Sequence, residues 1–187
     1  MIPAKYQWIT TKGQLPVLVT TALQYLGVKE YPTTQQNNPV IMEMANKLGI
    51  KNIYPNDETA WCGLFMCYVC VLAGKPMPYK SYEIVRAASF QTWGNEVKRD
   101  DLQLGDICVF RRPDGNHVGL CIAVSKNAAG KISTIHVLGG NQSNSVCFTE
   151  IGFDRLIAVR RFYATGAPAS ARQYVMSSSG QVSENEA

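Results

Sequence analysis

A polar run meets an apolar run in the stretch Asp57-Glu58-Thr59-Ala60-Trp61-Cys62-Gly63-Leu64-Phe65. The apolar residues, 60–73, predict a buried helix with a cysteine in its first turn. Either Thr59 or Asp57 could cap this helix, and the acidic residues precede it where the helix dipole favours negative charge. Because N–H groups at a helix start stabilise a thiolate, the position predicts a lowered pKa for Cys62 and a nucleophilic role. The alternative is a small buried residue, as most free cysteines are.

A nucleophilic cysteine needs a general base, and the chain contains only two histidines, His117 and His136. The pair Asp114-Gly115 predicts a hairpin between two apolar runs, which places His117 at the start of the second strand. There a rigid sheet can hold the imidazole against a thiol on a helix. His136 lies inside a third apolar run, where a histidine is more often structural. His117 is therefore the better candidate for the base.

Amide side chains follow the next predicted strand, in Gly139-Gly140-Asn141-Gln142. Asn141 could accept a hydrogen bond from the imidazole and fix its tautomer, which is the orienting role in a Cys–His arrangement. Gln142 and a displaced Asp57 are the alternatives for this role. The sequence therefore predicts Cys62, His117 and Asn141 as the catalytic residues.

Four motifs in this order resemble the CHAP family, the cysteine, histidine-dependent amidohydrolases/peptidases, which belong with the papain-like peptidoglycan hydrolases. The resemblance covers about residues 17–162 and looks most like the branch of phage endolysins and secreted cell-wall effectors. One position departs from the family pattern, because many members carry a glutamate two residues before the asparagine, where this chain has Gly139. The motifs are Trp61-Cys62-Gly63-Leu64-Phe65, Leu104-Gly105-Asp106-Ile107-Cys108-Val109-Phe110, Asn116-His117-Val118-Gly119 and Gly139-Gly140-Asn141-Gln142.

The resemblance implies hydrolysis of an amide bond in bacterial peptidoglycan, with Cys62 as nucleophile, His117 as base and Asn141 beside the histidine. The bond is either the N-acetylmuramoyl-L-alanine amide or a bond within the wall peptide. Two other functions stay open: a papain-like protein peptidase or acyltransferase, and a catalytically silent wall-binding module. The candidate substrate-binding residues are Asp57, Glu58, Trp61, Trp93 and Gln142.

Length and composition indicate one globular domain: the chain has 187 residues, of which 46% are apolar and 17% charged. The net charge of +4 suits an anionic polymer such as a cell wall but is too small to indicate nucleic acid. Most of the six cysteines fall in predicted helices or strands, so we expect small buried residues rather than disulfides. No Cys–His spacing matches a zinc site, and we expect no metal or other cofactor.

The sequence begins Met1-Ile2-Pro3-Ala4-Lys5 and lacks the apolar core of a signal peptide there. No apolar run reaches the roughly 18 residues that a membrane span needs. We therefore expect a protein made in the cytoplasm that reaches the cell wall in the periplasm through a holin pore or a secretion machine. A secreted toxin would need an immunity protein that covers the groove at Cys62, whereas a phage lysin would not.

Helical patterns precede strand patterns along the chain, which indicates an α+β fold. Short connections predict a small antiparallel sheet, with the N-terminal helices packed on it in the papain-like arrangement that the resemblance implies. We expect an extended lead-in over 1–14, a catalytic domain over 15–165 and a flexible tail over 166–187, where Gly, Ala, Pro, Ser and Gln predominate. The expected strands are 107–111, 117–125, 132–138, 145–149 and 156–162, and further helices are expected at 15–26, 39–48 and 82–89.

Overall fold

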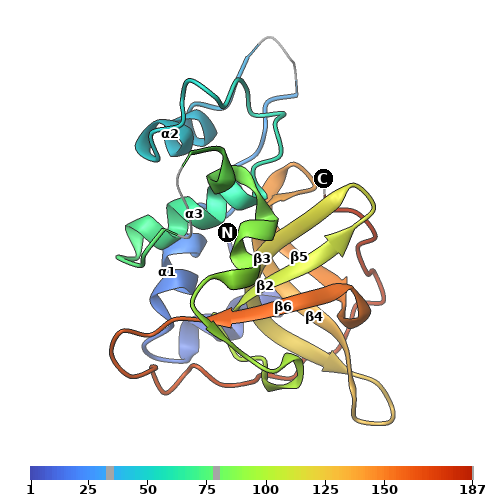
Figure 1. The fold of residues 1–187 in the computed structure, drawn as a ribbon. Helices are drawn as coiled ribbons and strands as arrows, with labels where there is room; N and C mark the ends of the chain where they lie inside the picture. Colours follow the sequence, from blue (N-terminus) through green and yellow to red (C-terminus); the bar gives the residue numbers. More distant parts are fainter. Residues whose placement is uncertain (33–35, 78–80, 187) are drawn as a thin grey trace.

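A six-stranded antiparallel sheet forms one side of the molecule, and helices pack against it (Figure 1). This computed structural model describes residues 1–32, 36–77 and 81–186. The strand order is β1-β6-β2-β3-β4-β5, so the predicted α+β class with an antiparallel sheet is confirmed. The strands are β1 (Asn95–Glu96), β2 (Ile107–Arg112), β3 (Gly115–Lys126), β4 (Ile132–Gln142), β5 (Ser145–Gly152) and β6 (Leu156–Arg161).

Three α-helices precede the sheet: α1 (Val17–Leu23), α2 (Pro39–Lys47) and α3 (Cys62–Leu72). The sequence predicts an extended lead-in over 1–14, but a 3-10 helix forms there because Tyr6 and Ile9 are buried. Within the described ranges, no helix combines the length and apolar character needed to cross a membrane. The 3-10 helices are η1 (Ala4–Thr11), η2 (Ser81–Val85), η3 (Ala87–Thr92), η4 (Arg99–Asp101) and η5 (Phe153–Arg155).

Helix α3 is buried along most of its surface, because its residues are apolar on every face. It packs on β3 and β4 and contacts α1, α2 and η2. Gly63 permits the closest approach, since a Cβ atom there would lie 2.3 Å from the carbonyl oxygen of Val85. On the sheet side, a Cβ atom on Gly140 would lie 2.7 Å from the Cβ of Phe65. Glycines on both sides therefore let the cysteine-bearing helix lie close to its neighbours.

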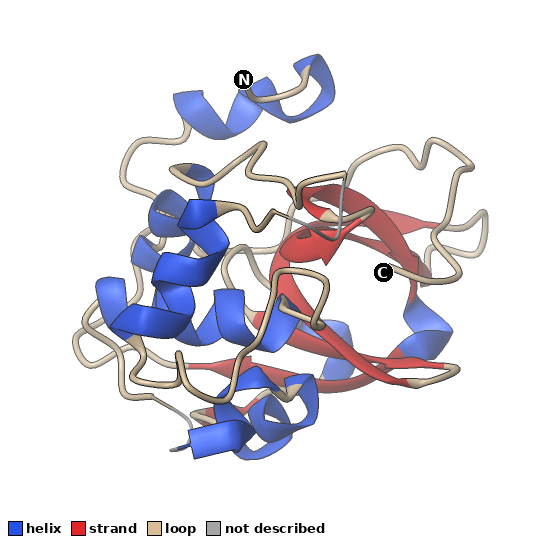
Figure 2. Cartoon of the chain, turned by 90° about the horizontal axis from the view of Figure 1, so that it is seen from above, coloured by secondary structure: helices blue, strands red, loops and turns tan. Residues whose placement is uncertain are grey.

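The sheet is strongly curved, and each of its faces carries an apolar core (Figure 2). Val109 and Val118 belong to the core shared with α3, whereas Cys108 and Phe110 belong to the core on the other face. Register shifts interrupt the pairing of β2 with β6, β3 with β4 and β4 with β5. Such irregularities bend and twist strands, which accounts for the curvature.

Strands β2 and β3 form the predicted hairpin, and Arg112 pairs with Gly115 at its end. Phe110 pairs with His117, and their ring centroids are 6.4 Å apart. Because successive residues of a strand point to opposite faces, the His117 ring shares a face with Phe110, whereas Val118 points to the core of α3. The hairpin thus directs the His117 ring to one face of the sheet and the next residue, Val118, to the core that includes α3.

The segment 166–186 lies along the sheet and differs in this from the predicted flexible tail (Figure 1, red). The backbone N–H of Met176 donates to the Val124 carbonyl at 2.9 Å, and that of Ser183 donates to the Glu150 carbonyl at 2.8 Å. Backbone hydrogen bonds hold the segment together with apolar contacts, since Tyr174 and Met176 pack against the first core. Composition alone does not reveal such contacts, which is why the sequence predicts a flexible tail.

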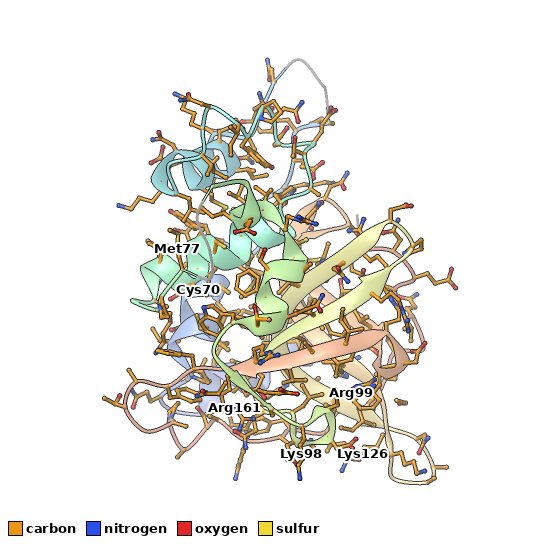
Figure 3. The ribbon with its side chains drawn as sticks, viewed as in Figure 1. Cys70, Met77, Lys98, Arg99, Lys126 and Arg161 are labelled. Atoms are coloured by element: carbon orange, nitrogen blue, oxygen red, sulfur yellow. The ribbon has the colours of Figure 1, made fainter. Side chains whose placement is uncertain are left out.

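The six cysteines are free and five are buried, which confirms the expectation of small buried residues. Figure 3 shows Lys98, Arg99 and Lys126 at the end of the molecule that lies far from α3. Cys70, labelled in the same view, belongs to α3. Arg161 pairs with the buried Asp106 carboxylate at 2.6 Å. Lys98, Arg99 and Lys126 therefore lie away from the cysteine-bearing helix, whereas Arg161 lines a pocket with Lys75, just after the end of α3.

Candidate active site

Cys62 is the first residue of α3, and only 3% of it is exposed. Neither predicted cap bonds to this helix: the Thr59 hydroxyl donates to the Asn56 side chain, and Asp57 bonds to other loops. The residue before the helix, Trp61, makes no side-chain cap. The N–H groups at the start of α3 are therefore left to face the thiol.

The backbone N–H groups of Val118, Gly63 and Cys62 itself favour the charged form of the Cys62 thiol and act to lower its pKa. Burial raises the pKa of the Cys62 thiol, while these hydrogen bonds and the charge of Arg112 act to lower it. Burial prevails, so the prediction of a lowered pKa is wrong for this structure. The physical reason is that desolvation of a buried thiolate outweighs the help from the helix start.

A groove of about 260 Å³ opens at Cys62. One wall consists of residues 85–88, between η2 and η3, and the other of residues 114–116 at the tip of the β2–β3 hairpin. Arg86 and Asp114, on opposite walls, are exposed and oppositely charged. The groove can therefore admit a chain with polar groups and bring it to the thiol.

His117 lies on β3 and has no exposed surface. Burial lowers the pKa of His117 to about 4, although Glu186 and the hydrogen bond to Gln142 act to raise it. Its Nε2 lies 3.0 Å from Gln142 Oε1. Its Nδ1 has no hydrogen-bond partner. The imidazole is therefore neutral at pH 7 and held from one side.

The other contacts of Gln142 decide which way its carboxamide points. Its Nε2 donates to the Cys147 carbonyl at 2.5 Å and lies 3.4 Å from the Val137 carbonyl. Because the nitrogen faces two acceptors, the oxygen faces His117 and accepts a hydrogen bond from its Nε2–H. The neutral imidazole then keeps its lone pair on Nδ1, which is the state that a general base requires.

The thiol and the imidazole both lie at the start of β3. Val118, whose N–H acts to lower the pKa of the Cys62 thiol, directly follows His117 in the chain. Within the described part of the chain, no hydrogen bond joins Cys62 to the His117 ring. The His117 ring shares the Phe110 face of the sheet, whereas Cys62 belongs to the core on the α3 face, so a Cys–His pair forms only if the ring turns toward the thiol.

Asn141, the residue predicted to orient the histidine, adopts a left-handed backbone conformation with φ of 55°. It is 3% exposed, and its Oδ1 has no hydrogen-bond partner. The pairing of β4 with β5 is irregular between Gly139 and Gln142, and this irregularity turns Gln142 toward the imidazole. A Cβ atom on Gly139 would lie 3.0 Å from Gln142 Oε1, so the carboxamide fills the space beside this glycine.

The acidic residues predicted to contact substrate lie elsewhere. Asp57 is 1% exposed, and its carboxylate accepts hydrogen bonds from the N–H groups of Asn38 at 2.8 Å and Tyr31 at 3.2 Å. It therefore ties two loops together. Glu58 is exposed, and neither residue lines the groove at Cys62.

The tryptophans predicted to contact substrate are core residues instead. Trp61 has no exposed surface, and its indole N–H donates to Glu30 at 2.6 Å. Trp93 is 5% exposed, donates to the Pro76 carbonyl at 3.0 Å and packs against Phe162. A tryptophan fills core and groove equally well, so its sequence position alone did not distinguish the two.

The second histidine, His136, is bonded through both ring nitrogens. Its Nδ1 lies 3.0 Å from the Tyr6 hydroxyl, and its Nε2 lies 2.8 Å from the Ser125 hydroxyl. Burial lowers the pKa of His136 to about 4. Such a fully bonded, buried histidine fits the structural role that the sequence favours for it.

Arg112 is a residue of the site that no sequence motif indicates. It lies at the end of β2, and its charge opposes the burial effect that raises the pKa of Cys62 and adds to the burial effect that lowers the pKa of His117. The one feature of the sequence that could have indicated Arg112 is its position next to the predicted hairpin turn. Among the residues that the structure describes, no group of three or more His, Cys, Asp or Glu could hold a metal ion.

No family model matches the chain. A search of curated proteins also finds no match.

Proposed function

We propose that the chain is a papain-like peptidoglycan hydrolase of the CHAP type that cleaves an amide bond of the wall peptide. The observation that carries the proposal is the adjacency of the two groups along β3. The backbone of Val118 acts on the Cys62 thiol, and the preceding residue, His117, has an Nδ1 without a hydrogen-bond partner. A thiol at a groove and a base of defined tautomer are the parts that cysteine-dependent acyl transfer needs.

Gly139 stands where many family members carry a glutamate, and the Gln142 carboxamide fills the space beside it. Family members that carry a glutamate there would direct its side chain into the region that the Gln142 carboxamide fills. Gln142 Oε1 accepts from His117 Nε2–H, as an orienting carboxylate would. We therefore assign Gln142 rather than Asn141 as the residue that positions the imidazole.

The reaction that we propose requires the His117 ring to turn from the face it shares with Phe110 toward Cys62. Its Nδ1 then takes the proton of the Cys62 thiol, and the thiolate attacks the amide carbonyl carbon. The new C–S bond places negative charge on the carbonyl oxygen, which the backbone N–H groups at the start of α3 stabilise. The imidazolium then gives its proton to the amine as the C–N bond breaks, which leaves a thioester on Cys62. His117 next removes a proton from water, and the resulting attack breaks the C–S bond and releases a carboxylic acid.

The wall peptide enters this proposal from the resemblance, and the groove at Cys62 is compatible with it. Both the muramoyl–alanine amide and a bond within the peptide would react by the same steps. Delivery through a holin or a secretion machine, and an immunity protein over the groove of a toxin, belong to the same proposal.

The test is hydrolysis of dye-labelled purified peptidoglycan by the wild type and by Cys62→Ala. We expect the variant to lose at least about a thousandfold in rate with an unchanged circular dichroism spectrum. Cys70→Ala is the matched control, because Cys70 is a buried cysteine of the same helix away from the groove. Retained hydrolysis in Cys62→Ala would reject the nucleophile. Turnover of proteins but not wall would favour the peptidase, and wall binding without turnover the silent module.

A further inference from the structure

A buried ion pair connects segment 178–186 to the sheet. Arg155 donates to both carboxylate oxygens of Glu186, at 2.8 and 2.7 Å. Glu186 is only 1% exposed, although Glu184 and Asn185 beside it are exposed. A single acidic side chain is therefore inserted into the molecule from an otherwise solvated strip.

The carboxylate of Glu186 lies beside the residues that hold His117. The Glu186 carbonyl accepts a hydrogen bond from the N–H of Ser143, which follows Gln142 in the chain, at 2.8 Å. Arg155 also donates to the carbonyl of Arg111, on β2, at 2.9 Å. The Glu186 charge acts on the imidazole, raising the pKa of His117 against the larger effect of burial.

Polar contacts hold this segment, and it buries little apolar surface. The Ser178 hydroxyl donates to the Glu150 carboxylate at 2.6 Å, and the Ser179 N–H donates to the same group at 3.0 Å. Val182, the apolar residue near its end, is 40% exposed. Contacts of this kind exchange readily with water or with another polar ligand, because they replace similar hydrogen bonds in solution.

A cavity of about 600 Å³ adjoins the ion pair. Three arginines, Arg111, Arg112 and Arg155, line it together with two carboxylates, Asp154 and Glu184. The Nε of Arg112 is buried without a hydrogen-bond partner. Guanidinium groups bind carboxylates in a bidentate fashion, so the lining suits an acidic ligand.

We propose that the Arg155 guanidinium forms a carboxylate-binding site near His117, which the Glu186 carboxylate fills in the resting chain and an acidic peptide substrate fills in its place. The Ser143 N–H holds the same segment through the Glu186 carbonyl. Only the identification of the ligand as substrate rests on the proposed hydrolase function. In the resting state His117 has no exposed surface, a condition that suits storage of the base better than its use. Displacement of Glu186 would connect binding of the acidic peptide to exposure of the imidazole.

The test is a titration with glutarate, followed by the imidazole NMR signals of protein labelled with ¹⁵N-histidine. In Glu186→Gln we expect saturable shifts of the His117 signals, with a Kd at least tenfold below that of the wild type, where Glu186 competes. The His136 signals serve as an internal reference, since the sequence contains only these two histidines. Glu96→Gln is the matched control: Glu96 is exposed on β1 and does not line this cavity, so this variant should bind glutarate as the wild type does.

Two further comparisons make the result specific. Neutral glutaramide should not bind, and adding Arg155→Met to Glu186→Gln should remove glutarate binding. Glu186→Asp, which keeps the charge but shortens its reach, should show intermediate affinity and provides a second variant if Glu186→Gln does not fold. Equal affinity in the Glu186→Gln and Glu96→Gln proteins, or equal binding of glutaramide, would overturn the proposal. Because the experiment measures binding of glutarate, its result does not depend on whether the protein hydrolyses peptidoglycan.

Discussion

At the scale of single residues, the chemistry of His117 depends on how Gln142 is held. Gln142 Nε2 donates hydrogen bonds to the carbonyl oxygens of Cys147 and Val137, so Gln142 Oε1 faces the imidazole. This sets the lone pair on Nδ1. Gln142, three positions after the site of the expected glutamate, thereby performs the same orienting task through a hydrogen bond without a charge.

Replacing Gln142 tests this assignment. Gln142→Ala removes the acceptor of His117 Nε2–H, and we expect kcat/KM for wall hydrolysis to fall about a hundredfold. Gln142→Glu keeps an acceptor and adds a negative charge, which raises the pKa of His117. The acidic limb of its pH–rate profile should therefore move to higher pH.

The control is Asn141→Gly, which removes the neighbouring amide and suits the left-handed backbone at this position. Hydrolysis by this variant should stay within about twofold of the wild type. Loss of activity in Asn141→Gly together with retention in Gln142→Ala would return the orienting role to Asn141.

Residue types and their order sufficed to predict where Cys62 and His117 lie, because a helix start and a hairpin are local features. They did not suffice to order Asn141 and Gln142. Which of two adjacent amides faces a histidine depends on the strand irregularity between residues 139 and 142, which no local pattern encodes. The pKa of Cys62 was predicted in the wrong direction, since burial is a property of the assembled fold.

At the scale of secondary structure, the contact of α3 with residues 85–87 shapes the groove. A Cβ atom on Gly63 would meet the Val85 carbonyl oxygen at 2.3 Å and the Ala87 nitrogen at 3.0 Å. These are backbone atoms, so they can move only with the whole groove wall. Alanine is ordinarily more favourable than glycine in a helix by about 1 kcal/mol. At position 63 the clash with the backbone of residues 85–87 makes alanine the less favourable residue.

We therefore expect Gly63→Ala to lower the free energy of unfolding by about 1–3 kcal/mol and to reduce wall hydrolysis. Urea unfolding and the dye-release assay measure the two effects. Gly166→Ala is the matched control, because nothing lies within 4 Å of a Cβ atom there. It should be neutral in both assays. A Gly63→Ala protein as stable and active as the wild type would contradict the close packing of α3 on the groove wall.

The long strands and the main helices were predictable because their apolar patterns extend over many residues. The two-residue strand β1 was not, since it depends on its pairing with β6 and not on a pattern of its own. Segment 166–186 was expected to be flexible because its sequence, too, shows no pattern of its own that reveals its partners. Its order comes from partners such as Val124 and Glu150, which lie far away in the sequence.

At the scale of the whole molecule, two neutral histidines are buried in the fold. Burial lowers the pKa of His117 and of His136 to about 4, below the ordinary value of 6.5. Between these pH values the unfolded chain binds protons that the folded chain does not. Stability should therefore fall as the pH decreases from 6.5 toward 4, by up to about 3 kcal/mol for each histidine.

Urea unfolding at pH 7, 6 and 5 measures this dependence. The Glu150 carboxylate contributes little in this range: burial would raise its pKa, but the Lys5 ammonium and the donors of Ser178 and Ser179 lower it to about 2. His117→Asn should reduce the slope by about half, since one of the two titrating groups is removed. A free energy of unfolding that does not change between pH 7 and pH 5 would contradict the burial of neutral imidazoles.

The most direct test of the central claim is mass spectrometry of the fragments released from purified peptidoglycan in H₂¹⁸O. We expect the wild type to release fragments with one new carboxyl group carrying a single ¹⁸O atom and one new amine, and Cys62→Ala to release none. Sugar-free peptides would identify the muramoyl–alanine amide as the bond cleaved, and shortened or uncrosslinked muropeptides a bond within the peptide. Label at sugar reducing ends, or the same products from Cys62→Ala, would contradict amide hydrolysis by this cysteine.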